Sequence, residues 1–259
     1  MKIVTLIENT PHSGLASEHG LSLYIETERY KILFDTGSSG AFADNAERLG
    51  IDLKQVDFVV LSHGHYDHGG GLARFAQINS AAPIYISDQA FAPHYNGVGK
   101  YIGLDGEVRN LDNIFPVLGH IRIGEGVELF PWNAVTERYP IDTCGMTVVE
   151  ENCIKPDVFC HEQYLLIREA GKTVCFSGCS HRGIENIVSA FPADVLVGGF
   201  HFMKLAPEDP RIDRAAEVLL SNGGVYYTGH CTGQPQFDRL KERMGDRLTT
   251  ISTGDVFVI

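Results

Sequence analysis

The 259-residue sequence has no apolar run of the roughly 18 residues that a membrane-spanning helix needs. Its opening stretch, residues 1–8, carries Glu8 where a signal peptide would still be apolar, and no small-residue cleavage site follows. We therefore interpret residues 1–8 as a first strand and expect a cytoplasmic protein with no membrane partner.

Positive charge is also scarce. The 21 Lys and Arg residues stand against 33 Asp and Glu residues, which gives a formal net charge of −12. This balance argues against nucleic acid or an anionic membrane as the main partner. It does not exclude an anionic small molecule, because a bound metal ion can reverse the local field.

The sequence has no CxxC pair, although it has six cysteines. They are spread over a chain that is long enough to bury its own hydrophobic core, so a disulfide scaffold is not needed. We expect reduced thiols, of which one or two take part in chemistry.

Apolar runs alternate with helical segments along the chain, and no Pro/Ser/Gly-rich linker divides it. This pattern is typical of an α/β protein, and we expect one domain over residues 1–259. The expected strands are 2–8, 21–26, 30–34, 58–61, 83–86, 146–149, 164–168, 173–177, 195–197, 225–228 and 256–259. The expected helices are 41–49, 72–78, 184–190, 211–220 and 237–244.

Residues 88–126 differ from the rest because glycines and Pro93 interrupt them and they carry several aromatic side chains. Two interpretations are open. The segment is either a long surface connection or a lid insertion over a functional site, since long loops in compact domains are often functional.

The most informative stretch is 61–71, LSHGHYDHGGG. It places His63, His65, Asp67 and His68 directly after a continuous apolar strand. Imidazole and carboxylate groups are suitable ligands for zinc, iron or manganese. His63 and His65 can face one side of an extended turn, whereas Asp67 and His68 start a new direction that would suit a second ion. The glycines allow the backbone to come close to the site.

This stretch resembles the HxHxDH motif of the metallo-β-lactamase superfamily, and Leu33-Phe34-Asp35-Thr36-Gly37 resembles the short turn that precedes it there. Four further segments resemble the dihydropterin–ribofuranosylaminobenzene-phosphate synthase-like group of that superfamily: 18–22, 177–181, 198–201 and 229–233. The resemblance implies a four-layer αββα sandwich of two mixed β-sheets flanked by helices, with two metal ions at one rim. It also implies that Asp35 supports the ligands.

Carried over residue by residue, the resemblance assigns His63 and His65 to a first ion and Asp67 and His68 to a second. Cys179 stands where most relatives have a bridging Asp, and His230 matches the last ligand of the second ion. A thiolate is a strong zinc ligand. The alternative for Cys179 is a small buried side chain without a ligand role.

The third histidine of the first ion is open, because the usual HTxG element is absent. His161 is the first candidate and His181 its rival, while His201 suits a ligand, a phosphate contact or a general acid. Either of the last two could also support a ligand. Glu162 is a further candidate for a ligand or an orienting residue.

These residues favour an enzyme: a binuclear-metal-dependent hydrolase, or a related transferase, that uses a metal-bound hydroxide on a small anionic substrate such as a phosphate or a pterin conjugate. The expected cofactors are two divalent transition-metal ions, zinc first, with manganese or iron as alternatives. Asp67 would steer the water, and His181 or His201 would protonate the leaving oxygen or hold a phosphate. The alternatives are a non-catalytic metal-binding sensor or interaction protein, and a di-iron oxidoreductase. His19 and the pair Glu8-Asn9 border the site in this interpretation.

Overall fold

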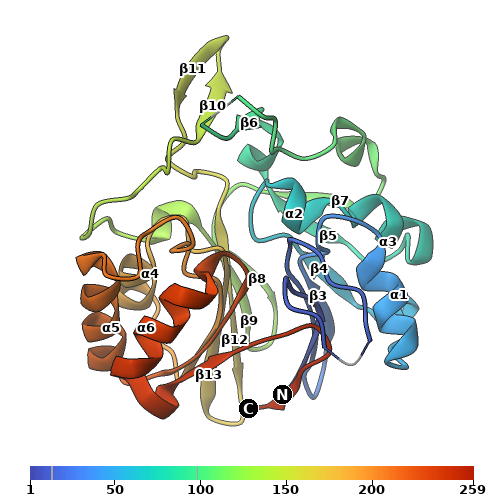
Figure 1. Cartoon of the computed structure of the whole chain (residues 1–259). Helices are drawn as coiled ribbons and strands as arrows, with labels where there is room; N and C mark the ends of the chain where they lie inside the picture. The colour runs from blue at the N-terminus through green and yellow to red at the C-terminus, as the bar shows by residue number, and fades with distance from the viewer. Residues whose placement is uncertain (13, 98) are drawn as a thin grey trace.

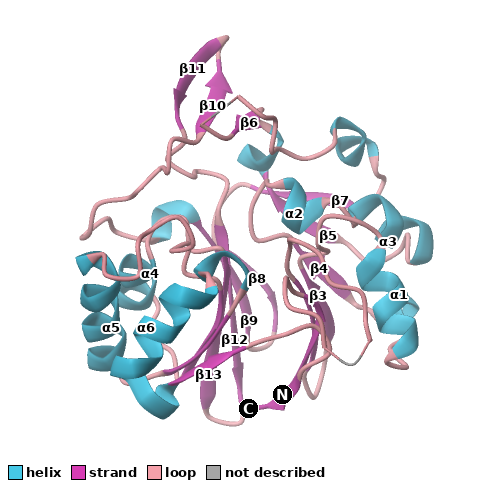
Figure 2. Ribbon diagram, in the orientation of Figure 1, coloured by secondary structure: helices cyan, strands magenta, loops and turns pink. Residues whose placement is uncertain are grey.

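The structure, a computed structural model, describes residues 1–12, 14–97 and 99–259. Two large sheets lie face to face, and helices cover their outer faces (Figures 1 and 2). This arrangement confirms the predicted αββα sandwich. Ser13 and Val98, which fall within the predicted domain, lie outside the described residues.

The first large sheet is built by the N-terminal half and closed by the last strand of the chain. Its strands, in spatial order, are β17 (Val256–Val258), β1 (Lys2–Ile7), β2 (Ser22–Glu26), β3 (Lys31–Phe34), β4 (Phe58–Val60), β5 (Ile84–Ser87) and β7 (Ile114–Val117). The run from β3 to β7 is parallel, whereas β17, β1, β2 and β3 pair antiparallel. The two chain ends therefore lie together at one edge (Figure 1).

The second large sheet comes from the C-terminal half. Its order is β16 (Leu248–Thr250), β15 (Val225–Thr228), β14 (Val195–Gly198), β13 (Lys172–Gly178), β12 (Gln163–Glu169), β9 (Val127–Pro131) and β8 (Ile121–Gly124). Here the strands from β13 to β16 are parallel and the others antiparallel.

The helices divide between the two outer faces. The N-terminal half contributes α1 (Ala41–Arg48), α2 (Tyr66–Gly69) and α3 (Leu72–Ile78), and the C-terminal half contributes α4 (Ile184–Ala190), α5 (Pro210–Asn222) and α6 (Gln234–Met244). Short 3-10 turns stand at Leu53–Gln55, Asp88–Phe91, Gly106–Asn110, Trp132–Ala134, His230–Thr232 and Gly245–Arg247. No helix in the described part of the chain is both long and apolar enough to cross a membrane.

The apolar core lies in three layers that match this architecture. One cluster fills the space between the two sheets, with Phe34 and Phe176 in ring contact at 5.6 Å. A second lies beneath α1 and α3, and a third beneath α4, α5 and α6. Burial of apolar surface from both sides explains why the central strands are continuous apolar runs.

The segment 88–126 contains more regular structure than the sequence indicated. It holds β7, β8 and β6 (His94–Tyr95). β7 and β8 are edge strands, where the exposed Pro116 is tolerated because one side needs no hydrogen bonds. Edge strands therefore lack the buried apolar pattern by which the central strands were predicted. The lid role and the single-domain organisation stay predictions.

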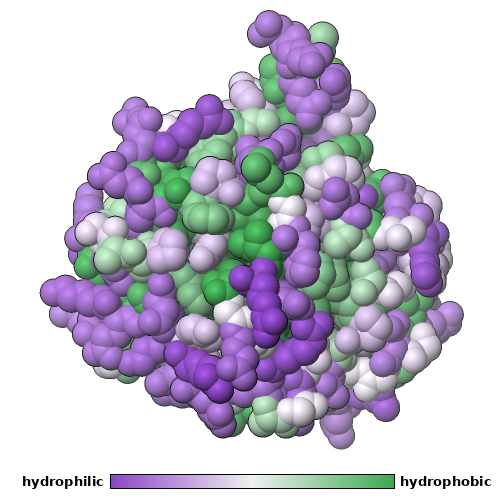
Figure 3. Space-filling model, turned by 180° about the vertical axis from the view of Figure 1, so that it is seen from behind, coloured by the Kyte–Doolittle hydropathy of each residue, from purple (hydrophilic) through white to green (hydrophobic). Residues whose placement is uncertain are grey.

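A small third sheet stands apart from the sandwich. β6 pairs with β10 (Thr147–Glu150), which forms a hairpin with β11 (Cys153–Pro156). The hairpin projects from the body (Figure 1), and its surface is mostly hydrophilic (Figure 3).

Candidate metal centre

The predicted site residues gather at one rim of the sandwich, where strands of both sheets end. Asp35 follows β3 and His63 follows β4, while Cys179, His201 and His230 follow β13, β14 and β15. These strands run parallel within each sheet, so their carboxyl ends share an edge and bring residues from both halves together.

Asp35 braces the histidines of the N-terminal half. Its Oδ2 lies 2.6 Å from Nδ1 of His68 and accepts a hydrogen bond of 2.7 Å from the Ser62 hydroxyl. The Ser62 hydroxyl has one proton and gives it to Asp35, so it accepts from Nδ1–H of His63 at 2.8 Å. Nδ1 of each ring is therefore engaged, which leaves Nε2 as the atom that a metal ion would bind. Although burial acts to lower the pKa of His68, the charge of Asp35 raises it, so a metal ion would replace a proton at that Nε2. The predicted supporting role of Asp35 agrees with this geometry.

His230 is held in the same way from the opposite half. Its Nδ1–H donates to Oδ1 of Asn9 at 2.9 Å, which leaves its Nε2 free. That atom lies 3.2 Å from Nε2 of His68, and Sγ of Cys179 lies 3.1 Å from the same His68 nitrogen. Two nitrogen lone pairs at this distance repel unless a proton or a cation lies between them. These donors therefore fit a metal ion.

A second set of donors uses the same cysteine. His63, Cys179 and His181 offer ligand atoms within 4.8 Å of one another, as do His68, Cys179 and His230. Nε2 of His63 and Nε2 of His181 are 3.3 Å apart. Cys179 thus belongs to two adjacent donor sets, which is the position that a bridging thiolate would occupy.

Asp67 lies at the outer side of this group. Its Oδ2 is 3.3 Å from Nε2 of His19 and 3.4 Å from Nε2 of His230. Although burial alone would raise the pKa of Asp67, its hydrogen bond with His19 and the nearby imidazoles of His230 and His68 hold it well below its usual range. Asp67 is therefore an anion that can bind a cation. The structure thus brings the predicted neighbours His19 and Asn9 into contact with the site.

Burial shifts the pKa of the Cys179 thiol and the pKa of the His181 imidazole in opposite directions. It raises the pKa of Cys179 well above its ordinary value and, together with neighbouring histidines, lowers that of His181 well below. Without a cation these groups are a neutral thiol and a neutral imidazole. A metal ion would have to displace the thiol proton, so metal binding must depend on pH.

The backbone at the site adopts conformations that residues other than glycine seldom use. Asp35, Ser180, His201 and His230 have φ values of 59°, 58°, 55° and 49°. Such strain persists only where surrounding contacts impose it, and it is concentrated at functional sites. Gly178 has φ +64°, and a Cβ there would lie 2.3 Å from the Ser62 hydroxyl. A glycine is therefore needed at the end of β13, where the chain passes the Ser62 hydroxyl that accepts from His63.

The structure separates His161 from His181. Nδ1 of His161 accepts a hydrogen bond of 2.9 Å from the backbone N–H of Gly64, so the neutral ring carries its proton on Nε2. A protonated nitrogen is a poor ligand, and this geometry favours His181 as the partner of His63. His161 instead lies in a group with His65, His94 and Asp157, whose ligand atoms are all within 4.8 Å of one another.

Glu162 is placed as an orienting residue. Its Oε1 accepts the backbone N–H of His181 at 2.7 Å, and its Oε2 accepts the Tyr164 hydroxyl at 2.6 Å and the backbone N–H of Arg182 at 3.2 Å. Burial raises the pKa of Glu162 to about 7 despite these bonds. The carboxyl group fixes the turn that carries His181.

A pocket of about 210 Å³ opens above the centre. His201 lines it together with Lys100 and Lys204, as do His19, His65 and Tyr66. Burial and the charge of Lys204 lower the pKa of His201 to about 4, so this imidazole is neutral at pH 7. Within the described ranges, neither lysine forms an ion pair with an acidic residue. Lys100 Nζ lies over the ring of Tyr66, 5.3 Å from its centroid, and this contact leaves its charge, like that of Lys204, available to an anion.

Five residues near the site were not predicted from the sequence: Ser62, His94, Lys100, Asp157 and Lys204. Ser62 immediately precedes His63 and could have been suspected from its hydroxyl. The others lie in segments without a recognisable motif, and only the fold brings them to the rim.

Comparison with known proteins finds related sequences and a related fold. The Metallo-beta-lactamase superfamily model matches residues 18–144. A solved structure of a metal-dependent hydrolase of the beta-lactamase superfamily superposes with a TM-score of 0.88 at 30% identity, and the match covers 100% of this chain and 99% of the other.

Two curated proteins of Methanocaldococcus jannaschii also match over most of their length. An uncharacterized protein is 27% identical over 93% of this chain and 94% of its own. The second is 7,8-dihydropterin-6-methyl-4-(beta-D-ribofuranosyl)-aminobenzene-5'-phosphate synthase, which is 27% identical over 99% of this chain and 96% of its own. Both matches therefore span the part of the sequence from which the rim is built.

Proposed function

The chain belongs to the metallo-β-lactamase superfamily, and from this membership and the geometry of the rim we propose that it is a metal-dependent hydrolase, or a related transferase, acting on a small anionic substrate. The observation that carries the proposal is the shared position of Cys179 in two adjacent donor sets. A single thiolate common to two sets of histidines is suited to holding two ions side by side.

In this proposal the first ion is bound by His63, His181 and Cys179 together with His65, whose ring centroid lies 4.6 Å from that of His63 and 4.9 Å from that of His181. The second is bound by His68, His230 and Cys179, with Asp67 beside it. Zinc is the metal we expect first, because imidazole and thiolate together suit it, and iron or manganese is the alternative. When bound, such ions polarise a carbonyl or phosphoryl oxygen and lower the pKa of water.

The remaining steps use the side chains of the chain itself. Asp35 fixes His63 and His68 in the tautomer that binds metal. Asp67 is an anion at pH 7 and can accept a hydrogen bond from an attacking water. His201 faces the pocket as a neutral imidazole, so it can hold or transfer a proton at the leaving group.

The anionic class of substrate is supported by the two lysines at the pocket. Lys100 and Lys204 place positive charge at the opening of a site in a chain of net charge −12. A phosphate or a pterin conjugate is the class to test first, since a relative that matches nearly the whole chain is a pterin-phosphate synthase.

The direct test is turnover by zinc-, manganese- and iron-loaded protein on panels of phosphodiesters, phosphomonoesters, thioesters and lactones. We expect turnover on at least one anionic panel, and we expect Cys179→Ser to lose most of it together with bound metal. For comparison, Cys153→Ser changes an exposed thiol far from the pocket and should leave both unchanged. Verified metal loading without turnover on any panel would contradict hydrolysis.

The lysines provide a separate test of the substrate class. Replacing Lys100 or Lys204 by Gln should raise KM for an anionic substrate about tenfold with little change in kcat, because the lost contact is made equally in the ground state and the transition state. Substitution by Arg should restore KM. An unchanged KM in both Gln variants would remove the anionic class from the proposal.

A further inference from the structure

His19 stands at the edge of the centre, and the proposed function gives it no role. It lines the pocket and its side chain is 45% exposed, whereas Asp67 and His230 beside it are buried. The three residues offer ligand atoms within 4.8 Å of one another. His19 is therefore either a metal ligand or a residue that positions Asp67, and the hydrogen bonds around it distinguish the two roles.

Asn9 fixes the position of the proton on the His19 ring. The backbone N–H of Gly20 donates to Oδ1 of Asn9 at 3.2 Å, and Nδ2 of Asn9 donates to the backbone carbonyl of His230 at 3.4 Å. These two contacts settle which end of the amide is the oxygen. Nδ2 therefore also donates to Nδ1 of His19, at 3.3 Å. Because that nitrogen accepts, the neutral ring carries its proton on Nε2.

The proton on Nε2 faces the carboxylate of Asp67. Nε2 of His19 lies 3.3 Å from Oδ2 of Asp67. A protonated nitrogen is a poor ligand, so this geometry does not suit a further ion between the two residues. Burial raises the pKa of Asp67, and the hydrogen bond with His19 is the strongest influence that lowers it. His19 thus acts on Asp67 as a hydrogen-bond donor.

His230 approaches the same oxygen with a lone pair. Its ring proton is on Nδ1 and is given to Asn9, while its Nε2 lies 3.4 Å from Oδ2 of Asp67. Two acceptors at this distance repel unless a cation lies between them. The oxygen that His19 holds is therefore the one that would meet the second ion. The rings of His19 and His230 lie side by side, with centroids 4.7 Å apart.

The segment that carries His19 is anchored on the backbone of Asp67. The backbone N–H of Leu21 donates to the carbonyl oxygen of Asp67 at 3.3 Å, and a Cβ at Gly20 would lie 2.6 Å from that oxygen. On the other side, Glu18 accepts two backbone N–H groups of the loop between β3 and α1, at 2.9 and 3.0 Å. The neighbours of His19 are thus fixed on both sides, which places its ring beside the carboxylate.

We propose that His19 is a positioning residue of the second ion site: its Nε2–H holds the Asp67 carboxylate toward the ion, and Asn9 sets the tautomer that this contact needs. Asn9 thereby orients one imidazole, that of His230, as a ligand and another, that of His19, as a donor. The partners of metal-binding residues commonly act in this way. The inference rests on the proposed function only in assigning Asp67 and His230 to the second ion.

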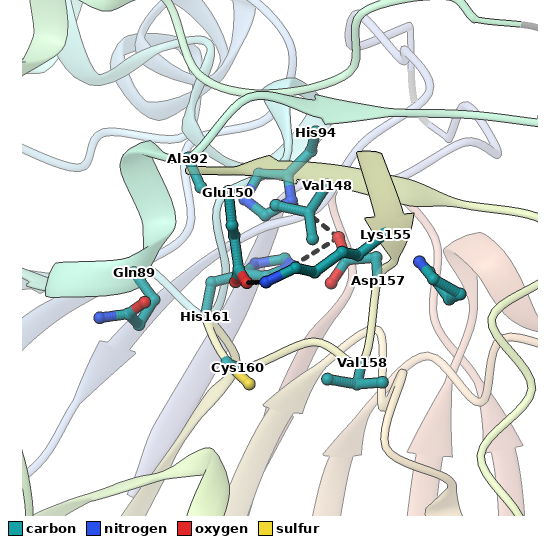
Figure 4. Close-up of a pocket in the computed structure, with 11 residues that line it drawn as sticks. Gln89, Ala92, His94, Val148, Glu150, Lys155, Asp157, Val158, Cys160 and His161 are labelled. Atoms are coloured by element: carbon teal, nitrogen blue, oxygen red, sulfur yellow. Dashed lines mark hydrogen bonds and ion pairs between the residues drawn. The ribbon is translucent and has the colours of Figure 1, made fainter. Parts of the chain in front are cut away.

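Another imidazole–carboxylate pair, on the side of the first ion, supplies an internal comparison. Nδ1 of His94 lies 2.7 Å from Oδ2 of Asp157, and both residues line a cavity of about 340 Å³ under the β10–β11 hairpin. Figure 4 shows the His94 ring directed toward Asp157. The His94 ring lies 5.6 Å from that of His65, which belongs to the first ion in the proposed function. Breaking this pair shows whether any lost imidazole–carboxylate contact near the centre weakens the second ion.

The test is a zinc titration of the full chain against a competing chelator, with the number of ions counted at saturation. We expect His19→Ala to weaken the second ion about tenfold, with the first ion and the saturating number unchanged. Because the amide nitrogen of Gln takes nearly the place of Nε2, His19→Gln should restore most of the affinity. His94→Gln should leave the second ion unchanged. So should His12→Ala, which breaks an exposed pair with Asp255 at 3.1 Å.

Nitrogen NMR of the full chain, with and without zinc, reports the tautomer directly. At a pH where the His19 ring is neutral, we expect its proton on Nε2 in wild type and a mixture of both tautomers in Asn9→Ala. This measurement needs neither turnover nor a second ion, so the inference and the proposed function can fail separately. A chain that shows the expected zinc affinities and tautomer but hydrolyses nothing would keep the inference and lose the proposed function.

Four results would overturn the inference. Loss of one ion at saturation in His19→Ala would make His19 a ligand. Equal affinities of His19→Ala and His19→Gln would show that the donor is not what the second ion depends on. An equal weakening by His94→Gln would make the effect a general one. A proton on Nδ1 of His19 in wild type would contradict the donation from Asn9.

Discussion

The two halves of the molecule position their site residues by different means. In the N-terminal half one buried carboxylate, Asp35, fixes two imidazoles through short hydrogen bonds, and the ligands follow each other in one continuous turn. In the C-terminal half the site residues follow three strand ends, and His201 and His230 stand on left-handed backbone. Hydrogen bonds and left-handed backbone occur in both halves, since Asp35 has φ 59°, but only in the C-terminal half do imidazoles of the site stand on that backbone.

This difference shows where each half depends on the other. The strained His230 is held by two residues of the N-terminal half: Glu8 accepts its backbone N–H, and Asn9 accepts its ring N–H. The C-terminal ligands are therefore complete only when the two sheets are packed together. The N-terminal histidines, by contrast, carry their brace with them.

The largest effect is expected from breaking the N-terminal network with Asp35→Asn. Asp35 is fully buried and accepts from the Ser62 backbone, the Ser62 hydroxyl and His68. An amide cannot accept from all three, so we expect a loss in unfolding free energy on the order of 3–5 kcal/mol. Metal affinity should fall about 10- to 100-fold. Urea unfolding and competition with a chelator measure the two effects.

The matched control is Asp112→Asn, which makes the same chemical change at an exposed position. It should leave both quantities within experimental error. If Asp35→Asn behaved like this control, Asp35 would not orient the histidines.

The contrast between the halves also explains what the sequence could predict. The N-terminal ligands stand in one short motif directly after an apolar strand, so local pattern was enough to choose them. The C-terminal site residues are set by where β13, β14 and β15 end, and the ligands among them by which neighbour takes the ring proton. Sequence alone left His161 and His181 as rivals because the Gly64 hydrogen bond that separates them joins residues far apart in the chain.

The contrast between local pattern and tertiary contact also explains which strands the sequence could predict. Central strands such as β4 and β13 are buried from both sides and show as apolar runs, and α3, α4 and β15 were predicted with their observed bounds. The edge strands β7 and β8 are half exposed and resemble loops in sequence. His94 and Asp157 went unpredicted because only tertiary packing makes them neighbours.

An intermediate effect is expected from Glu162→Gln, which tests the brace of the C-terminal half in the metal-free protein. The pKa of Glu162 is about 7 in the folded chain against an ordinary 4.5, so between these pH values the folded state holds more protons than the unfolded state. Stability from this group is therefore present below pH 4.5 and is lost as pH rises to 7, by about 3 kcal/mol in all.

Replacement by Gln removes that titration. As the pH rises from 4.5 to 7, wild type should lose about 3 kcal/mol of unfolding free energy relative to Glu162→Gln. Urea unfolding of both proteins at a series of pH values measures this loss. Other titrating groups cancel in the difference. Parallel stability curves for the two proteins would mean that Glu162 is already ionised at low pH.

The smallest effect is expected at the link between the halves, Asn9→Ala. This change removes the acceptor of the His230 ring proton at 2.9 Å, and a single partly buried hydrogen bond contributes about 1 kcal/mol. We expect about a fivefold weaker second ion, with the first ion unchanged, in a chelator titration that resolves the two. Asn9→Asp keeps an acceptor and adds negative charge behind the imidazole, so it should bind the second ion at least as tightly as wild type. If Asn9→Ala weakened both ions equally, the link would stabilise the packing of the sheets and not His230 alone.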